Sequence, residues 1–187
     1  FLKESVPVER RLNLSLYQVT TLYAAILKDE SFRRPMFAGC LTGAALFCYI
    51  SSASAVFMGQ YGLSQQQFSY AFAMNAGGIM LMSSLNKHLN TRMDIFPRLR
   101  LGGTIQCFGA LIVVSAGLMN HAPLWLLMSG LFLVVSGIGL TGPNAMALAM
   151  SKQGARAGTV SAIMGSMQLA CGLLGGVILN FLIWKAS

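Results

Sequence analysis

The residues that could carry catalysis are few in this chain of 187 residues and stand apart from one another. His88 and His121 have no carboxylate together with a serine or cysteine near them in sequence, as nucleophilic catalysis requires. The five acidic residues form no pattern typical of acid–base catalysis, and no phosphate-binding loop is present. The four cysteines are far apart in apolar stretches and show no metal-ligand spacing. We therefore expect no enzyme active site, no metal and no cofactor.

Three amides inside long apolar runs are the best candidates for binding chemistry: Asn75, Asn144 and Gln168. Polar groups within a membrane span usually face the bundle interior or a water-filled cavity. They could hold a small molecule through hydrogen bonds, or only bond neighbouring helices, which contributes about 0.6 kcal/mol each. Both interpretations stay open for the amides, whereas the serines of the first run are expected mainly to bond neighbouring helices.

The stretch 137–150, GIGLTGPNAMALAM, places a helix breaker beside one of these amides. Proline lacks a backbone N–H and clashes with the preceding turn, so Gly142 and Pro143 predict an interrupted helix. In lipid, freed backbone carbonyls are tolerated only where protein or a water-lined cavity satisfies them. Transporters place interrupted helices at binding sites or moving joints. Gly142 and Pro143 are thus a candidate hinge, with a kink needed only for packing as the alternative.

The composition indicates that these residues belong to a membrane protein. The chain is 55% hydrophobic and 10% charged, against about 25% charged residues in soluble domains, and its mean hydropathy is +0.64. Crossing a bilayer takes about 20 apolar residues. Five stretches qualify: 36–57, 68–85, 99–118, 123–150 and 157–184. Apart from Arg100 at the second position of 99–118, they contain no Asp, Glu, Lys or Arg. The predicted fold class is an all-α integral membrane protein, a polytopic helical bundle.

The basic residues predict the orientation of this bundle. The net charge is +8, and twelve of the thirteen Lys and Arg fall on one side of the predicted membrane, with Lys185 alone on the other. The positive-inside rule makes the basic side cytoplasmic. We expect a multi-pass protein of the cell membrane, surrounded by lipid, with a cytoplasmic N-terminus and an external C-terminus for this chain. Because the charge reports topology, we do not expect nucleic acid as a partner.

Residues 1–34 are predicted to form a cytoplasmic segment ahead of the membrane domain 35–187. Within it, Leu12, Leu16, Val19, Tyr23 and Ile26 recur at helical spacing with polar residues between them. This pattern predicts an amphipathic helix over 12–27 that lies on the inner membrane face. We expect this helix to end at residues 29–31 and Pro35 to open the first span, where its missing N–H costs nothing.

The last predicted span carries a stripe of small residues at steps of three and four, with Gln168 in its middle. Such a stripe lets helix backbones approach closely. We expect it to pack against another helix. Its small members are Gly158, Ser161, Gly165, Gly172 and Gly175.

Several blocks of the chain resemble one family of membrane proteins. They are FLKESVP (1–7), FCYISSASAVF (47–57), YGLSQQQFSYAFAMNAGG (61–78) with the later Asn86, GPNAMALAM (142–150) and RAGTVSAIMGSMQ (156–168). Taken together, the chain resembles the C-terminal half of a major facilitator superfamily transporter, most like the Bcr/CflA group of drug:proton antiporters.

The resemblance implies twelve helices in two six-helix bundles that work by alternating access, with drug and proton exchanging in a central cavity. The five spans would be the seventh to eleventh helices, so the N-terminal half and the last helix would be partners missing from this sequence. The acid that couples protons generally belongs to that half, and the proton gradient would be the energy source. The loop NKHLNTRMDIFPRLR matches the superfamily's basic loop motif only loosely, and a gating role for Arg92 and Asp94 rests on that match. Carried over, the cavity-facing set is Tyr49, Ser51, Ser54, Asn75, Asn144 and Gln168.

The leading hypothesis is therefore part of a secondary drug exporter. A superfamily member with another cargo, such as a sugar or metabolite, is one alternative. The absence of charged residues inside the spans favours apolar or cationic drugs over anionic cargo. A non-transporting membrane assembly protein is a second alternative, but a mere anchor needs neither the Gly-Pro pair nor polar interior residues.

Overall fold

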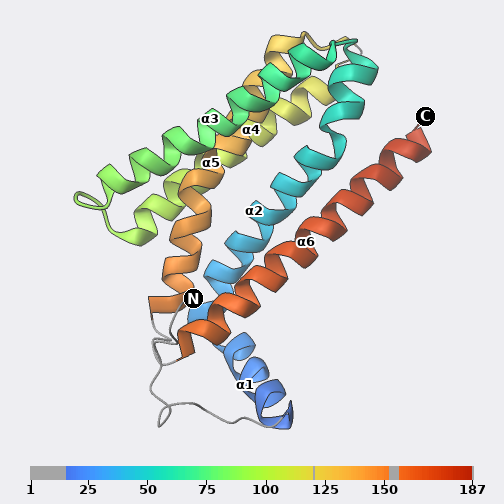
Figure 1. Ribbon diagram of the computed structural model, residues 1–187. Coiled ribbons are helices and arrows are strands. Elements are labelled where there is room, and N and C mark those ends of the chain that lie inside the picture. Colours follow the sequence, from blue (N-terminus) through green and yellow to red (C-terminus); the bar gives the residue numbers. More distant parts are fainter. Residues whose placement is uncertain (1–15, 120, 152–155, 187) are drawn as a thin grey trace, which may run out of the picture.

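The computed structural model describes residues 16–119, 121–151 and 156–186, and every regular element in them is a helix (Figure 1). The elements are α1 (Leu16–Lys28), α2 (Glu30–Ser54), the π-helical segment η2 (Ala55–Gln60), α3 (Gln65–Leu89), α4 (Ile95–Gly117), α5 (Leu124–Ser151) and α6 (Ala157–Ala186). The predicted all-α membrane class is confirmed. Residues 1–15, which hold the first resembling block and the start of the predicted amphipathic helix, lie outside the described part.

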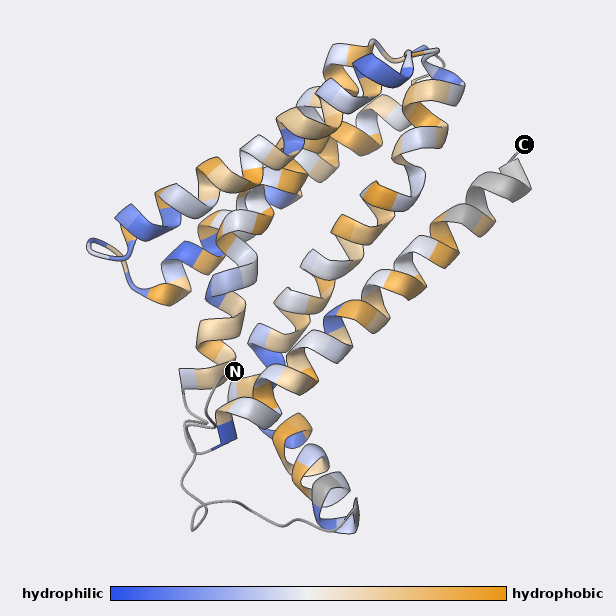
Figure 2. Ribbon diagram, in the orientation of Figure 1, coloured by the Kyte–Doolittle hydropathy of each residue, from blue (hydrophilic) through white to orange (hydrophobic). Residues whose placement is uncertain are grey.

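Four of these helical stretches are long and apolar enough to cross a membrane: Glu30–Gln60, Ile95–Gly117, Leu124–Ser151 and Ala157–Leu179. Helix α3 has 25 residues but is less apolar, because glutamines, serines and asparagines lie along it. The predicted count of five spans is therefore not confirmed. Figure 2 shows hydrophobic residues along the long helices and hydrophilic ones gathered at their ends, notably around the turn between α3 and α4.

The helices form two groups joined by α5. Helices α3, α4 and α5 run alongside one another, and α2 runs beside α6 (Figure 1). Helix α2 also packs against α5, which connects the groups. The close approach of α3 and α5 depends on Gly139, where an added Cβ would lie 2.5 Å from the carbonyl oxygen of Ile79. Small residues of this kind let helix backbones approach closely in a membrane.

Helix α1 packs against the bundle through Ile26, which is buried in an apolar cluster with residues of α2, α5 and α6. Tyr23 is half-buried against the same cluster. The next helix does not open at Pro35 as expected: α2 begins at Glu30, because Asp29 caps it by accepting a hydrogen bond from the backbone N–H of Ser31 at 2.9 Å. Pro35 therefore lies inside α2.

The predicted interruption at Gly142 and Pro143 is wrong, because α5 continues through both residues from Leu124 to Ser151. Side chains bond backbone carbonyls in the turn before the proline: Asn144 Nδ2 donates to Leu140 O at 2.8 Å, and Thr141 Oγ1 to Gly137 O at 3.2 Å. Pro143 itself lacks the N–H that would bond the Gly139 carbonyl, so these side-chain bonds support neighbouring carbonyls of the helix around it. Helix α5 nevertheless changes direction along its length (Figure 1), and a role of this point as a moving hinge stays a prediction.

The π-helical segment η2 continues α2 directly and was not predicted from the sequence. Its wider turn is visible in the hydrogen bond from Tyr61 N to Val56 O, five residues back, at 3.1 Å. Within it Phe57 is fully buried and packs near Phe68 of α3, with ring centroids 6.2 Å apart. After a short turn, Ser64 and Gln67 form a reciprocal capping box that starts α3.

Candidate functional site

The six residues predicted to face one cavity lie in separate places. Tyr49 and Asn75 meet between α2 and α3. Asn144 joins a polar network between α3, α4 and α5. Gln168 lies between α2 and α6. Ser51 and Ser54 are on exposed positions of α2. The structure thus brings together only Tyr49 and Asn75 from the predicted set.

Tyr49 and Asn75 form a hydrogen-bonded pair inside the bundle. Asn75 Nδ2 donates to the Tyr49 hydroxyl at 2.9 Å. Asn75 is 0% exposed, and its Oδ1 has no hydrogen-bond partner among the described residues. An amide atom buried without a partner is costly, so such atoms are rare in folded proteins. This pair therefore keeps an unused hydrogen-bonding atom where water is excluded.

Aromatic rings border this pair. The Tyr49 ring stacks on Phe72 of α3 with ring centroids 5.5 Å apart and an interplanar angle of 18°. Phe72 in turn contacts Phe68, with centroids 6.0 Å apart. Because Phe72 is 38% exposed, the ring stack extends from the buried amide toward the surface of the described bundle. An aromatic wall with a polar group is a usual composition for a small-molecule site.

A second polar cluster, which we call the Arg98 network, comprises Arg98, Asn86, Asn90 and Asn144. Arg98 of α4 donates from Nη1 to Asn86 Oδ1 at 3.0 Å and from Nη2 to Asn90 Oδ1 at 2.8 Å. Asn144 of α5 donates from Nδ2 to the same Asn86 Oδ1 at 2.8 Å. Arg98 Nε also reaches the Asp94 carbonyl oxygen at 3.3 Å. The network joins three helices through hydrogen bonds to neutral oxygens.

Sequence reasoning placed Arg98 in a loop and missed this network. The structure puts Arg98 in the first turn of α4 with 5% exposure. The sequence signal that could have placed Arg98 in the helix is its position four residues after Asp94, the N-cap residue of α4. The two residues predicted to act as a gate are both exposed: Arg92 lies in the turn before α4, and the Asp94 side chain makes no capping hydrogen bond.

The small-residue stripe of α6 meets α2 over part of its length. An added Cβ at Gly172 would collide with the Phe47 ring, and one at Gly175 would lie 3.1 Å from Cys48 Sγ. Gln168 sits against two glycines of α2: its Nε2 lies 2.6 Å from a Cβ built on Gly39. Its amide is therefore part of a helix contact.

The other stripe positions have no such contact in the described part of the chain. An added Cβ at Gly158 or Gly165 would have no atom within 4 Å of it. The Ser161 hydroxyl bonds its own helix at Gly158 O, 2.9 Å away. Gly142, the candidate hinge, is equally open.

A pair of threonine hydroxyls links α2 and α5. Thr42 Oγ1 donates to Thr141 Oγ1 at 3.0 Å, and both residues are buried. The pair lies at the wall of an apolar groove of ≈ 330 Å³ between α2, α4 and α5. Gln106, another wall residue, donates to Val134 O at 3.2 Å. The polar groups at this groove therefore already make hydrogen bonds to protein atoms.

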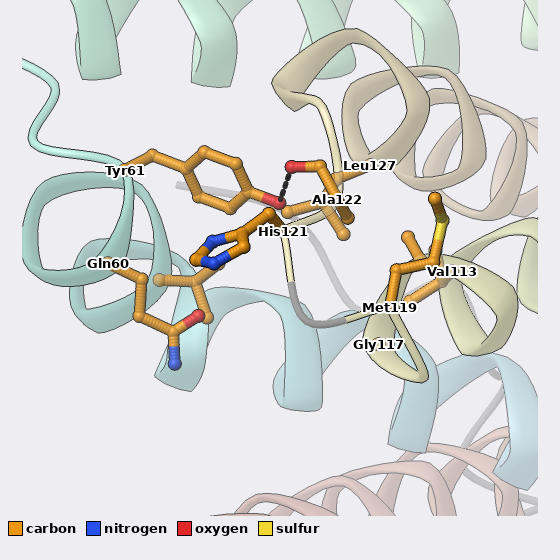
Figure 3. A pocket seen from close by; sticks show the side chains of 10 residues that line it. Gln60, Tyr61, Val113, Gly117, Met119, His121, Ala122 and Leu127 are labelled. Atoms are coloured by element: carbon orange, nitrogen blue, oxygen red, sulfur yellow. Dashed lines mark hydrogen bonds between the residues drawn. The ribbon is translucent and has the colours of Figure 1, made fainter.

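A larger cavity of ≈ 840 Å³ opens near the predicted external end, between η2, the end of α4 and the start of α5. Tyr61 closes one side by donating its hydroxyl to the Ala122 carbonyl oxygen at 3.0 Å. Gln60 and His121 lie on the same side as Tyr61, and Val113 and Met119 lie opposite (Figure 3). The residues lining this cavity are outside the predicted set.

Long apolar helices with polar contacts buried between them define an integral membrane protein of the helical-bundle class. Comparison with known sequences shows its family. The sequence profile of the Major Facilitator Superfamily matches residues 3–176. The chain belongs to this superfamily.

Three relatives make the comparison more specific. The chain is 32% identical over 178 residues to the uncharacterized MFS-type transporter YdgK of Bacillus subtilis, covering 95% of this chain and 43% of the relative. It is 27% identical over 168 residues to a bicyclomycin resistance protein homolog of Haemophilus influenzae, covering 90% and 42%. It is 26% identical over 157 residues to the multidrug transporter MdfA of Escherichia coli, covering 83% and 38%.

These relatives confirm the resemblance to transporters of the Bcr/CflA type. The chain spans about two fifths of the length of the relatives it matches.

Proposed function

We propose that the chain forms the C-terminal half of a secondary active transporter that exports drug-like molecules in exchange for protons by alternating access. Two relatives named for bicyclomycin resistance and multidrug transport support this assignment. Its partners would be the N-terminal half and last helix of the same transporter, with lipid around them.

The observation that carries the proposal is the character of the bundle interior. Among the described residues, the buried polar side chains are Thr42, Asn75, Arg98, Ser136, Thr141 and Asn144, and only Arg98 is charged. Arg98 lies in the first turn of α4, at the end of the bundle. An interior of amides, hydroxyls and aromatic rings suits neutral or cationic drugs, whereas anionic cargo usually requires an Arg or Lys beside it.

The proton would be carried elsewhere in the whole transporter. The described acidic residues Asp29, Glu30 and Asp94 all lie at helix ends, where none can exchange a proton in mid-membrane. The proposed orientation puts the end of the bundle that holds the Arg98 network at the cytoplasm, because the basic residues gather there.

The test is efflux by the complete reading frame in cells that lack their own drug exporters. Expression should lower the steady accumulation of ethidium, and a protonophore should restore it. The Asn144→Leu variant at equal membrane abundance should export less than the wild type, because α5 loses its bond to α3. Unchanged accumulation of ethidium and of a panel of neutral drugs would reject the drug-exporter proposal and favour a sugar or metabolite as cargo.

A further inference from the structure

The Tyr49–Asn75 pair has more hydrogen-bonding capacity than the protein uses. The Tyr49 hydroxyl accepts from Asn75 Nδ2, and no described residue accepts its own hydrogen. Asn75 Oδ1 accepts from no described residue and is buried. One donor and one acceptor are therefore left over on two side chains that touch each other.

Turning the Asn75 amide over does not remove this excess. Tyr49 would then donate to Oδ1, and the amide nitrogen would become the buried atom without a partner. In both orientations a third group is missing that would accept a hydrogen bond from one side chain of the pair and donate one to the other. A hydroxyl or a secondary amide does both.

The surroundings suit such a group on an aromatic molecule. Phe72 stacks on Tyr49 and is 38% exposed, so one ring face leads from the bundle surface to the pair. The apolar cluster around Tyr49 contains Ala53, Phe57 and Val135, which present no charge. Aromatic rings stack favourably at centroid separations of about 4.5–7 Å.

We propose that Tyr49 and Asn75 form a subsite for a neutral hydroxyl or amide group on an aromatic ligand, with Phe72 stacking on the ligand's ring. This inference deepens the proposed function, because it names the chemistry of the cargo at one point of the transport path. The ligand group accepts from the Tyr49 hydroxyl and donates to Asn75 Oδ1. Entry requires Phe72 to exchange its stack on the Tyr49 ring for a stack on the ligand's ring.

The test measures binding to the purified full-length protein in lipid nanodiscs, with two probes that differ by one hydroxyl. Naphthalene-2-methanol carries the hydroxyl and 2-methylnaphthalene lacks it. Saturable binding, corrected with empty nanodiscs, should be about tenfold tighter for the alcohol, since the hydrocarbon leaves the pair unsatisfied. Tyr49→Phe and Asn75→Leu should each remove this preference and leave the hydrocarbon's affinity unchanged.

Ser136→Ala is the matched control. Ser136 is also buried near α3, but its hydroxyl bonds its own helix at Leu133 O, 3.3 Å away. This variant should keep the tenfold preference. Tyr49→Phe retains the ring and its packing, so it tests the subsite even if Asn75→Leu fails to fold.

Three results would overturn the subsite: equal affinity of the wild type for both probes, no saturable binding of either, or an equal loss for both probes in Tyr49→Phe. The last would show that the pair only joins α2 and α3. Ethidium efflux judges the proposed function separately. A protein that prefers the alcohol but exports nothing retains the subsite and loses the exporter assignment.

Discussion

Helix α3 carries two polar regions three turns apart, and they differ in how completely their hydrogen bonds are made. In the Arg98 network, Asn86 Oδ1 accepts from both Arg98 and Asn144, and Asn90 Oδ1 accepts from Arg98. In the Tyr49–Asn75 pair, one bond is made and one buried atom is unpartnered. The Arg98 network uses its polar groups to join helices, whereas the Tyr49–Asn75 pair leaves Asn75 Oδ1 without a hydrogen bond.

This difference separates two roles that looked identical in the sequence. A satisfied network inside a protein rigidifies the elements it joins, whereas an unpaired buried group is a local cost. Asn144 and Asn75 are both asparagines within apolar runs, yet the first bonds α3 and its own helix, and the second faces an aromatic pair. Satisfaction of hydrogen bonds, more than residue type, therefore separates structural from ligand-binding amides.

The strongest test of the comparison removes the centre of the satisfied network. Arg98→Ala should lower the free energy of unfolding by about 3 kcal/mol, because hydrogen bonds to a charged group are lost and buried acceptors are left unpaired. Arg100→Ala is the control, since Arg100 is exposed on the same helix. Thermal unfolding of the full-length protein in detergent measures both. Equal midpoints for the two variants would show that the network contributes no stability.

A smaller loss is expected where α3 meets α5 between the two regions. Gly139→Ala puts a Cβ 2.5 Å from a backbone oxygen that cannot easily move, and overpacking of this kind costs about 1–3 kcal/mol. Gly142→Ala meets nothing within 4 Å and should leave the unfolding midpoint unchanged or raise it slightly, because alanine favours a helix more than glycine does. If Gly142→Ala also reduces efflux at normal stability, the hinge prediction for this position gains support. A stable Gly139→Ala would contradict the close approach of α3 and α5.

The hydroxyl pair between α2 and α5 should matter less. Thr42→Val removes the hydrogen bond to Thr141 at nearly constant volume, and such interhelical bonds contribute about 0.6 kcal/mol in membrane proteins. The unfolding midpoint should fall slightly, with Thr104→Val as the control because Thr104 is exposed and bonds its own helix. A fall as large as that of Arg98→Ala would mean that single hydroxyl contacts stabilise the bundle as much as the network does.

The smallest effect on stability is expected at the Tyr49–Asn75 pair. Asn75→Leu loses one hydrogen bond but also removes a buried unpaired amide atom, so the two effects should cancel to within about 1 kcal/mol. The unfolding midpoint of Asn75→Leu should therefore stay close to that of the wild type. A loss comparable to Arg98→Ala would show that both regions are structural and would end the contrast between them.

The sequence predicted the helices better than it predicted the contacts between them. The five apolar runs correspond to five long helices, whose bounds differ from the expected ones by at most six residues. Four of these helices qualify as candidate membrane spans. The exception at α3 has a physical reason: its polar residues lower its hydropathy although its length is sufficient. Stretch length and apolarity are local properties, so a single chain reports them directly.

The site depended on information that local patterns lack. Asn75 and Asn144 were both recognised as candidates, but their partners Tyr49 and Asn86 lie 26 and 58 residues away in sequence. Arg98 was missed because a basic residue near a span is ordinarily a topology signal. Pro143 was expected to interrupt its helix because the carbonyl contact made by the neighbouring Asn144 side chain requires the folded helix.

The π-helical segment η2 changes the direction in which side chains at the end of the first long helix point. A π turn holds about one residue more than an α turn, so by Gln60, where the helix ends, the side chains have rotated by about 100° relative to an unbroken α-helix. Phe57 lies inside this segment, and it belongs to the same buried apolar cluster as Tyr49, eight residues earlier. Deleting either Ala55 or Val56 would restore the α-helical phase before Phe57. The Phe57 ring would then turn away from Phe68, which it contacts in the structure. The extra residue of the π turn thus sets the direction in which the end of this helix presents its side chains to α3.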